Sequence, residues 1–234
     1  GFLLKTDNQG NQQWIKYYGS VNTDRICNLI ETNDGFMIAG SNRQYNQYYD
    51  NWYIVRTDTD GNVIWQWILQ NNALHDFWVK DLIQTKDSNF IAVGGKTYGQ
   101  DFGYSFQNAR LLKFDKNKNI IIDTLYYEPM EDTNLPNWQT QSNFDRITEL
   151  NNGNLLVTCY CYYRLNKWVS TTKLYELLPT GKLIKKRRFT SVPYGDPEEL
   201  IEDFIVDKIP AKQMSAAAIF GGHVGLNEVV FDRA

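Results

Sequence analysis

The sequence predicts an all-β protein, a β-propeller of four-stranded antiparallel blades, and two observations support this fold class. A turn motif rich in Asp, Gly and Asn recurs four times, starting at Asp7, Asp58, Asp115 and Leu178. Successive copies lie 51, 57 and 63 residues apart, which is a typical length for one blade. Short segments rich in β-branched and aromatic residues flank each copy. We expect about four to five blades, forming a whole propeller or part of a larger one.

The recurring turn joins the first two strands of each repeat unit. Its Gly and Asn residues tolerate the positive φ angles that a tight reversal of the chain requires. The first strands are predicted at residues 2–6, 52–57, 110–114 and 172–176. The second strands are predicted at residues 13–18, 63–69, 120–126 and 183–190. Because the run 63–69 is almost continuously apolar, we expect it to be covered on both faces by neighbouring blades.

Two further strands complete each unit. The third strands are predicted at 26–32, 79–85 and 146–150, and the fourth at 36–41, 90–96 and 155–163. Short turns rich in Asn, Asp and Gly separate the third strand from the fourth. Four short antiparallel strands in 50 to 60 residues are typical of a propeller blade. A two-sheet sandwich would show cleaner alternation of polar and apolar residues and would not explain a repeated turn.

We assign the whole chain, residues 1–234, to one domain. Its units span approximately 2–51, 52–108, 109–170 and 171–227, with a closing strand at 228–234. The pattern weakens in the last unit. Residues 197–208 fit a short helix, because Asp196 and Pro197 suit a helix N-terminus. The alternative is a strand at 203–209, in the place of a third strand. Residues 214–221 and 228–232 are expected to be closing strands.

The repeats resemble those of a family of secreted surface proteins. Residues 5–14 read Lys-Thr-Asp-x-x-Gly-Asn-x-x-Trp and residues 34–40 read Asp-Gly-Phe-x-Ile-Ala-Gly. This pairing, which returns at 56–65 and 87–94, is similar to the propeller repeats of bacterial and archaeal surface proteins. The resemblance covers roughly residues 1–190 and implies a propeller at the cell surface, outside the cell or in the periplasm. The spacing of the turn residues differs from the tryptophan-docking motif of quinoprotein dehydrogenases and from the Asp-box of sialidases.

Composition and charge exclude several classes of function. The net charge of the 234-residue chain is −3, whereas nucleic-acid-binding surfaces are basic, so we predict no nucleic-acid partner. No apolar run is long enough for a membrane span, so no membrane insertion is expected. The basic run 185–188 is expected on an exposed strand. The cysteines, Cys27, Cys159 and Cys161, are expected to be small apolar core residues.

The residue types that usually carry catalysis or bind metals are sparse and unclustered. The two histidines, His75 and His223, cannot form a three-histidine zinc site. The turn at Asp58 has acidic residues but lacks the later oxygen ligands of a calcium loop. The acidic residues that could serve a glycosidase fall in connections or in the predicted helix: Glu128, Glu131, Asp132, Glu198, Glu199, Glu202 and Asp203. We predict no catalytic residue, no metal site and no cofactor.

Strand parity predicts where ligands bind. In a four-stranded antiparallel blade the first and third turns lie at one end, and the longer connections lie at the other. The long connections are 43–50, 98–108, 128–143, 162–168 and 191–197, and they are rich in Tyr, Trp, Asn, Gln and Arg, as adaptable recognition surfaces are. The candidate ligand-binding residues of this long-loop face are Tyr45, Tyr48, Tyr49, Tyr104, Trp138, Arg164, Trp168 and Tyr194. These rings could instead cover blade edges.

Taken together, the sequence predicts a non-enzymatic extracellular binding or scaffold module. Its partner would be a protein or a glycan, recognised through the long-loop face. One alternative is a glycan-directed enzyme, a hydrolase or lyase that uses acidic residues of the same face. A second alternative is a structural spacer within a large surface protein.

Overall fold

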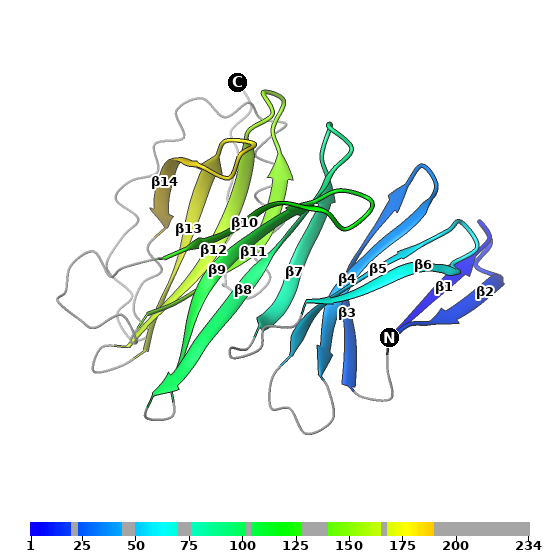
Figure 1. Cartoon of the computed structure of the whole chain (residues 1–234), viewed down its shortest axis with the longest axis horizontal. Helices are drawn as coiled ribbons and strands as arrows, with labels where there is room; N and C mark the ends of the chain where they lie inside the picture. The colour runs from blue at the N-terminus through cyan, green and yellow to red at the C-terminus, as the bar shows by residue number, and fades with distance from the viewer. Residues whose placement is uncertain are drawn as a thin grey trace. The chain divides into compact units, whose positions relative to one another are not determined.

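The computed structural model describes residues 1–19, 23–43, 50–69, 76–101, 104–127, 140–164 and 168–189. The chain divides into two compact units, 1–199 and 200–234, and the described residues all belong to the first. Every regular element in them is a β-strand (Figure 1). The predicted strands and helix beyond residue 190, including the two interpretations of 197–208, lie outside the described residues.

The strands form a hairpin followed by three four-stranded antiparallel meanders. The hairpin is β1 (Phe2–Thr6) with β2 (Gln12–Tyr17). The first sheet is β3 (Thr23–Thr32), β4 (Gly35–Arg43), β5 (Asn51–Thr57) and β6 (Val63–Leu69). The second sheet is β7 (Asp76–Gln84), β8 (Phe90–Asp101), β9 (Tyr104–Phe114) and β10 (Ile120–Tyr126). The third sheet is β11 (Thr140–Glu149), β12 (Leu155–Arg164), β13 (Trp168–Leu177) and β14 (Leu183–Phe189).

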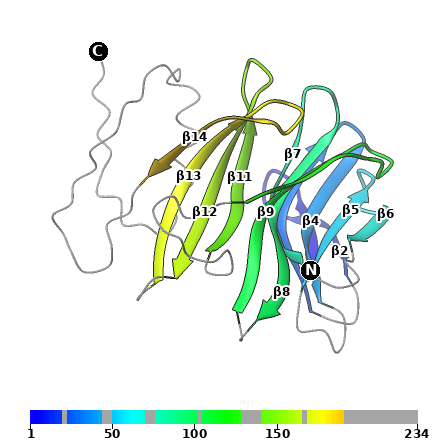
Figure 2. The same ribbon diagram turned by 60° about the vertical axis from the view of Figure 1, so that its left-hand side comes forward.

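One backbone pair joins the second and third sheets. Gln107 of β9 and Gln141 of β11 form a parallel pair, so that β7 to β14 make one eight-stranded sheet of mixed direction. Figure 2 shows β11 to β14 beside β7 to β9. Each meander is offset by two strands from the sequence units: it takes the third and fourth strands of one unit and the first two of the next.

Three buried cores lie between consecutive sheets. The hairpin and the first sheet share a core that includes Tyr18, Ile38 and Tyr53. The first and second sheets share a larger one that includes Met37 and Trp52. Adjacent residues of β4 and β5 therefore alternate between two cores, as strands covered on both faces must.

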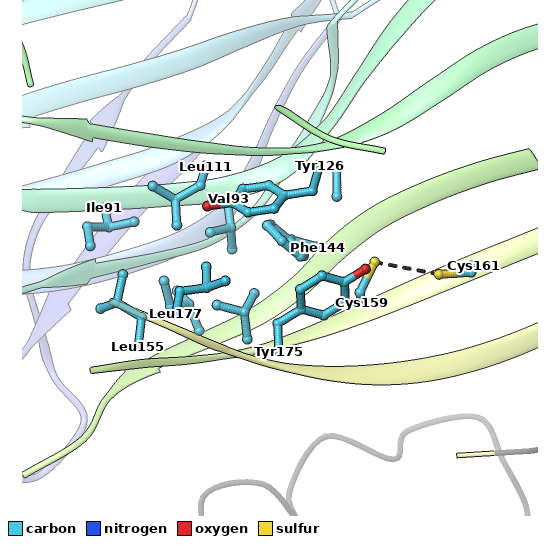
Figure 3. Packing of buried hydrophobic residues seen from close by; sticks show 13 residues of the cluster. Ile91, Val93, Leu111, Tyr126, Phe144, Leu155, Cys159, Cys161, Tyr175 and Leu177 are labelled. Carbon is cyan, nitrogen blue, oxygen red and sulfur yellow. Dashed lines mark hydrogen bonds between the residues drawn. The ribbon is translucent and has the colours of Figure 1, made fainter. Parts of the chain in front are cut away.

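The core between the second and third sheets is aromatic at its centre. Figure 3 shows the rings of Tyr126, Phe144 and Tyr175 close together. The Phe144 centroid lies 4.9 Å from that of Tyr126 and 5.3 Å from that of Tyr175, and both pairs are tilted or edge-on, which are favourable ring geometries. Cys159 and Cys161 are buried in the same core with their sulfur atoms 3.6 Å apart.

Most predicted strands are confirmed, and the bounds at 2–6, 63–69 and 120–126 agree with β1, β6 and β10. Two expectations about burial were wrong. Strand β6 is the outermost strand of its sheet, and Val63 and Ile64 are half-exposed. Cys27 is exposed rather than part of the core. The basic run lies on β14, where Lys185 and Lys186 are exposed as predicted.

Two of the predicted long connections are mostly strand. Residues 98–101 and 104–108 pair with each other across the β8–β9 hairpin, with Tyr98 opposite Phe106. Residues 162–164 likewise pair with β13, with Tyr162 opposite Ser170. Polar and aromatic residues read as loop in the sequence, but a neighbouring strand satisfies their backbone groups and extends the ladder.

The β1 strand is exposed where its counterparts are buried. Counted back from the recurring turn, Phe2 and Leu4 correspond to Tyr53 and Val55 of β5. Phe2 and Leu4 are 56% and 50% exposed, whereas Tyr53 and Val55 are 2% and 0% exposed. In the described residues β1 pairs only with β2, while β5 also pairs with β4. The hairpin thus presents the outer half of a sheet.

Candidate functional site

The recurring turn is held by its own side chains. In the turn at Asp58, one carboxylate oxygen accepts the backbone N–H groups of Asp60 and Asn62 at 2.9 and 2.8 Å. The other accepts the side-chain amide of Asn62 at 3.0 Å. The turns at Asp7 and Asp115 have the same three bonds. Both oxygens of each carboxylate are therefore used within the turn, which makes these residues scaffold.

The end of the sheets that carries these short turns is joined by contacts between neighbours. Tyr18 donates its hydroxyl to the carbonyl of Gly61 at 2.8 Å. Lys86 donates to the carboxylate of Glu149 and to two carbonyls of the next short turn. Arg56 forms an ion pair with Asp34, which lies in the other turn of its own sheet. These contacts place both kinds of short turn at one end, as strand parity predicted.

The predicted ligand-binding residues are mostly outside the described part of the chain. This holds for Tyr45, Tyr48, Tyr49, Trp138 and Tyr194, and also for both histidines and all seven candidate carboxylates. The backbone of the other three is described. Tyr104 begins β9 opposite Asp101, and Arg164 and Trp168 face each other at the β12–β13 turn.

A polar cluster lies instead on the first strand of each sheet. Each of these strands, β3, β7 and β11, has a bulge at the same position relative to its partner strand, at Cys27, Lys80 and Asp145 respectively. A bulge re-aims side chains and is frequent beside functional sites. We call the residues at and around the bulges the first-strand site: Arg25, Cys27, Asn28, Trp78, Lys80, Asp81, Asp145 and Arg146.

Buried Asp81 connects the three first strands. Its carboxylate accepts the side-chain amide of Asn28 on β3 at 2.5 Å and the backbone N–H of Ile147 on β11 at 2.9 Å. It also accepts the N–H of Leu82 on its own strand at 2.9 Å. Burial raises the pKa of Asp81, and the hydrogen bonds from Ile147 and Leu82 oppose that rise. The carboxylate therefore fixes the positions of the strands that form the site.

Three cationic side chains lie near Cys27, whose side chain is exposed although protein atoms pack around part of it. This packing raises the pKa of the thiol overall, while Lys80, Arg25 and Arg146 lower it and Asp50 raises it further. A thiol with a raised pKa is a weak nucleophile at neutral pH, so the geometry suits binding better than covalent catalysis. Arg146 also donates to the carbonyl of Lys80 at 3.0 Å.

The indole of Trp78 holds two of these cations. The Arg25 guanidinium lies 4.8 Å and the Lys80 ammonium 5.2 Å from its ring centroid, within the range of cation–π attraction. The Trp78 N–H donates to Asp50, which forms an ion pair with Arg43 at 3.0 Å. Arg43 and Asp50 flank residues 44–49, the connection with three of the predicted tyrosines, so the base of that connection is tied to the first-strand site.

One amide oxygen in the site is left without a partner. Asn28 Oδ1 is buried and accepts no hydrogen bond from the described residues, which costs on the order of 1–3 kcal/mol. Sequence reasoning missed this site because a bulge is defined by the partner strand. The available signal was that three unlike residues, Cys27, Lys80 and Asp145, each stand between an apolar residue and a polar one.

Within the described ranges, no group of three or more His, Cys, Asp and Glu residues is placed to bind a metal. The same ranges contain no helix of the length and apolar character needed to cross a membrane. Comparison with protein-family models and with curated protein sequences gives no match to this chain.

Proposed function

We propose that the chain is a β-propeller module that binds a protein or glycan ligand at the first-strand site, and that it acts outside the cell or at the cell surface. The propeller assignment is supported by three successive four-stranded meanders with a core between each pair. The proposed location rests on the resemblance of the repeats to those of secreted surface proteins.

One observation carries the proposed function. The repeats of this chain have the same residue types at three of their turns but different residue types at the bulges of their first strands. Three turns repeat the same Asp–Asn hydrogen bonds. By contrast, the three bulges present a thiol, an ammonium and a carboxylate. A purely structural bulge would not require unlike side chains. The divergence therefore supports recognition of a ligand that differs in chemistry from one strand to the next.

The enzymatic alternative has less support. The carboxylates that the sequence offers for glycan cleavage lie outside the described residues, and Asp81 is committed to three hydrogen bonds that position strands. Glycosidases need two carboxylates facing each other across the scissile bond. The first-strand site does contain a second carboxylate, Asp145, which is near enough to raise the pKa of Asp81, but Asp81 itself is buried.

Blocking the site chemically tests the proposal without knowledge of the ligand. A bulky maleimide should react with exposed Cys27 and spare Cys159 and Cys161, which are fully buried. The labelled and unlabelled chains would be compared on a panel of immobilised neutral polysaccharides, acidic polysaccharides and unstructured polypeptides. We expect binding to at least one class, and loss of that binding after labelling.

The matched control is Cys27→Ser, whose binding, at whatever level it has, should not change when the reagent is added. Unchanged binding by the labelled chain would contradict the proposed site. Absence of binding to every class would favour the spacer alternative.

A further inference from the structure

We propose that the first-strand site binds the carboxylate or sulfate group of an acidic polysaccharide among Arg25, Lys80 and Arg146. This inference rests on the proposed function and adds the chemical class of the ligand. Its starting point is geometric: Arg25 of β3 and Lys80 of β7 lie over the same Trp78 ring, and Arg146 of β11 donates to the carbonyl of Lys80.

The cations are available to a ligand because the nearby acidic groups have other partners. Asp50 is engaged by Arg43 and Trp78, and Asp81 by Asn28 and two backbone N–H groups. Neither Arg25 nor Lys80 forms an ion pair with a carboxylate of the described residues. Among the described residues nearby, the carboxylates of Asp81 and Asp145 offset two of the three positive charges of Arg25, Lys80 and Arg146. The site is thus positive in a chain whose net charge is negative.

The cations are also held in place before any ligand arrives. Arg25 and Lys80 lie over the Trp78 ring at 4.8 and 5.2 Å, and Trp78 is fixed by its bond to Asp50. A guanidinium whose face rests on a ring keeps its N–H edge free to donate in parallel to two oxygens of a carboxylate or sulfate. Preorganisation of this kind lowers the entropy lost on binding.

Donor chemistry favours a polysaccharide over an acidic peptide. Arg and Lys side chains only donate hydrogen bonds. An acidic sugar is rich in acceptor oxygens, with its carboxylate or sulfate, ring and hydroxyl oxygens. A sugar hydroxyl can accept from a cation while its own hydrogen bonds to water, whereas the N–H group that a peptide brings at every residue can only donate.

The test is calorimetric titration of the chain with polygalacturonate, heparin, pullulan and poly-glutamate at two salt concentrations. Polygalacturonate carries carboxylates, heparin carries sulfates as well, and pullulan is neutral. We expect at least one acidic polysaccharide to bind, with affinity that falls as salt rises, and pullulan and poly-glutamate to bind at least tenfold more weakly. Arg25→Gln and Lys80→Gln should each weaken binding about tenfold, because each removes one charge-assisted hydrogen bond to the ligand.

Lys185→Gln is the matched control, because Lys185 is an exposed lysine on β14. Arg25→Lys, which keeps the charge but not the paired donors, should weaken binding less than Arg25→Gln does. Thermal unfolding of each variant separates loss of binding from loss of fold. If both glutamine variants bind like the wild type, or poly-glutamate binds as tightly as the polysaccharides, the inference is wrong.

The two proposals fail in different ways. If maleimide at Cys27 blocks binding of pullulan and the glutamine variants do not change it, the site binds a ligand but not an acidic one. If neither maleimide labelling nor the glutamine variants reduce binding of any ligand, both proposals are wrong.

Discussion

Two kinds of junction join consecutive sheets at the short-turn end. At the first and third junctions a buried tyrosine, Tyr18 or Tyr126, donates its hydroxyl to the carbonyl of a turn glycine, Gly61 or Gly181. At the second junction the tyrosine position holds Leu69, which has no donor. There the indole of Trp65 donates to the turn carbonyl of Lys116 at 3.0 Å instead.

The turn residues change together with the donor. Gly61 and Gly181 have φ of +75° and +80°, and a Cβ on Gly61 would lie 3.0 Å from the hydroxyl of Tyr18. At the second junction the same turn position is Lys118, also left-handed at φ 72°, and its ammonium lies over Trp65. At both junctions with a phenol, the next turn has glycine at the position that the hydroxyl approaches. Without the phenol, a larger residue is accommodated there.

The largest expected effect is that of Gly61→Ala. The new Cβ would meet the Trp14 ring at 2.9 Å and the Tyr18 hydroxyl at 3.0 Å, in a backbone conformation that itself costs ~1–2 kcal/mol. We expect a total loss of ~2–4 kcal/mol, including overpacking, measured by urea unfolding. Gly10→Ala is the control, because Gly10 is also left-handed but has nothing within 4 Å of a Cβ. Equal losses for the two variants would contradict the steric part of the explanation.

Tyr126→Phe should have the next largest effect. It removes the donor to the Gly181 carbonyl in a buried place, which should cost ~1–2 kcal/mol of unfolding free energy. Tyr17→Phe serves as the control, since Tyr17 is largely exposed, and should change stability little. A Tyr126→Phe variant as stable as the wild type would show that the hydroxyl does not hold the junction.

A third expectation concerns alkaline pH. Burial raises the pKa of Tyr126 to about 12, from an ordinary value of 10.0. A raised pKa in the folded state gives stability that is fully present below pH 10 and is lost as pH rises toward 12. Urea unfolding between pH 9 and 11.5 should therefore show a decline that is smaller in Tyr126→Phe. Tyr53, whose pKa burial also raises to about 12, should leave part of the decline in that variant. Identical pH curves for the two proteins would exclude Tyr126 as a cause.

The smallest effect is expected at the turns themselves. The side-chain and backbone bonds from Asn62 lower the pKa of Asp58 below its ordinary value of 3.8. At pH values above 3.8 the ionised carboxylate stabilises its turn. This stabilisation is lost as pH falls through the lowered pKa. Amide hydrogen exchange between pH 5 and 2 should show earlier loss of protection at Gly61 than at Gly181. Both amides donate to the carbonyl of the first turn residue, which is Asp58 in one turn and Leu178 in the other. The same response at both amides would argue against a role for the carboxylate.

The strands and turns could be predicted from the sequence because they are local. Alternating apolar residues and the Asp–Asn turn are visible within ten residues, and each carries its own hydrogen bonds. The first-strand site could not be predicted in the same way. Asn28 and Asp81 are 53 positions apart, and their contact depends on how two sheets pack. The register shift that exposes Cys27 depends on β4, which lies after the next turn.

The hairpin at the start of the chain has a consequence for handling the protein. Phe2 and Leu4 of β1 are apolar and half-exposed. Among the described residues, β1 pairs with β2 on one side and has no partner strand on the other. Bare apolar side chains on an open strand edge can template the addition of further strands, including those of another molecule. Leu4→Lys should therefore reduce self-association that starts from this edge and grows with protein concentration.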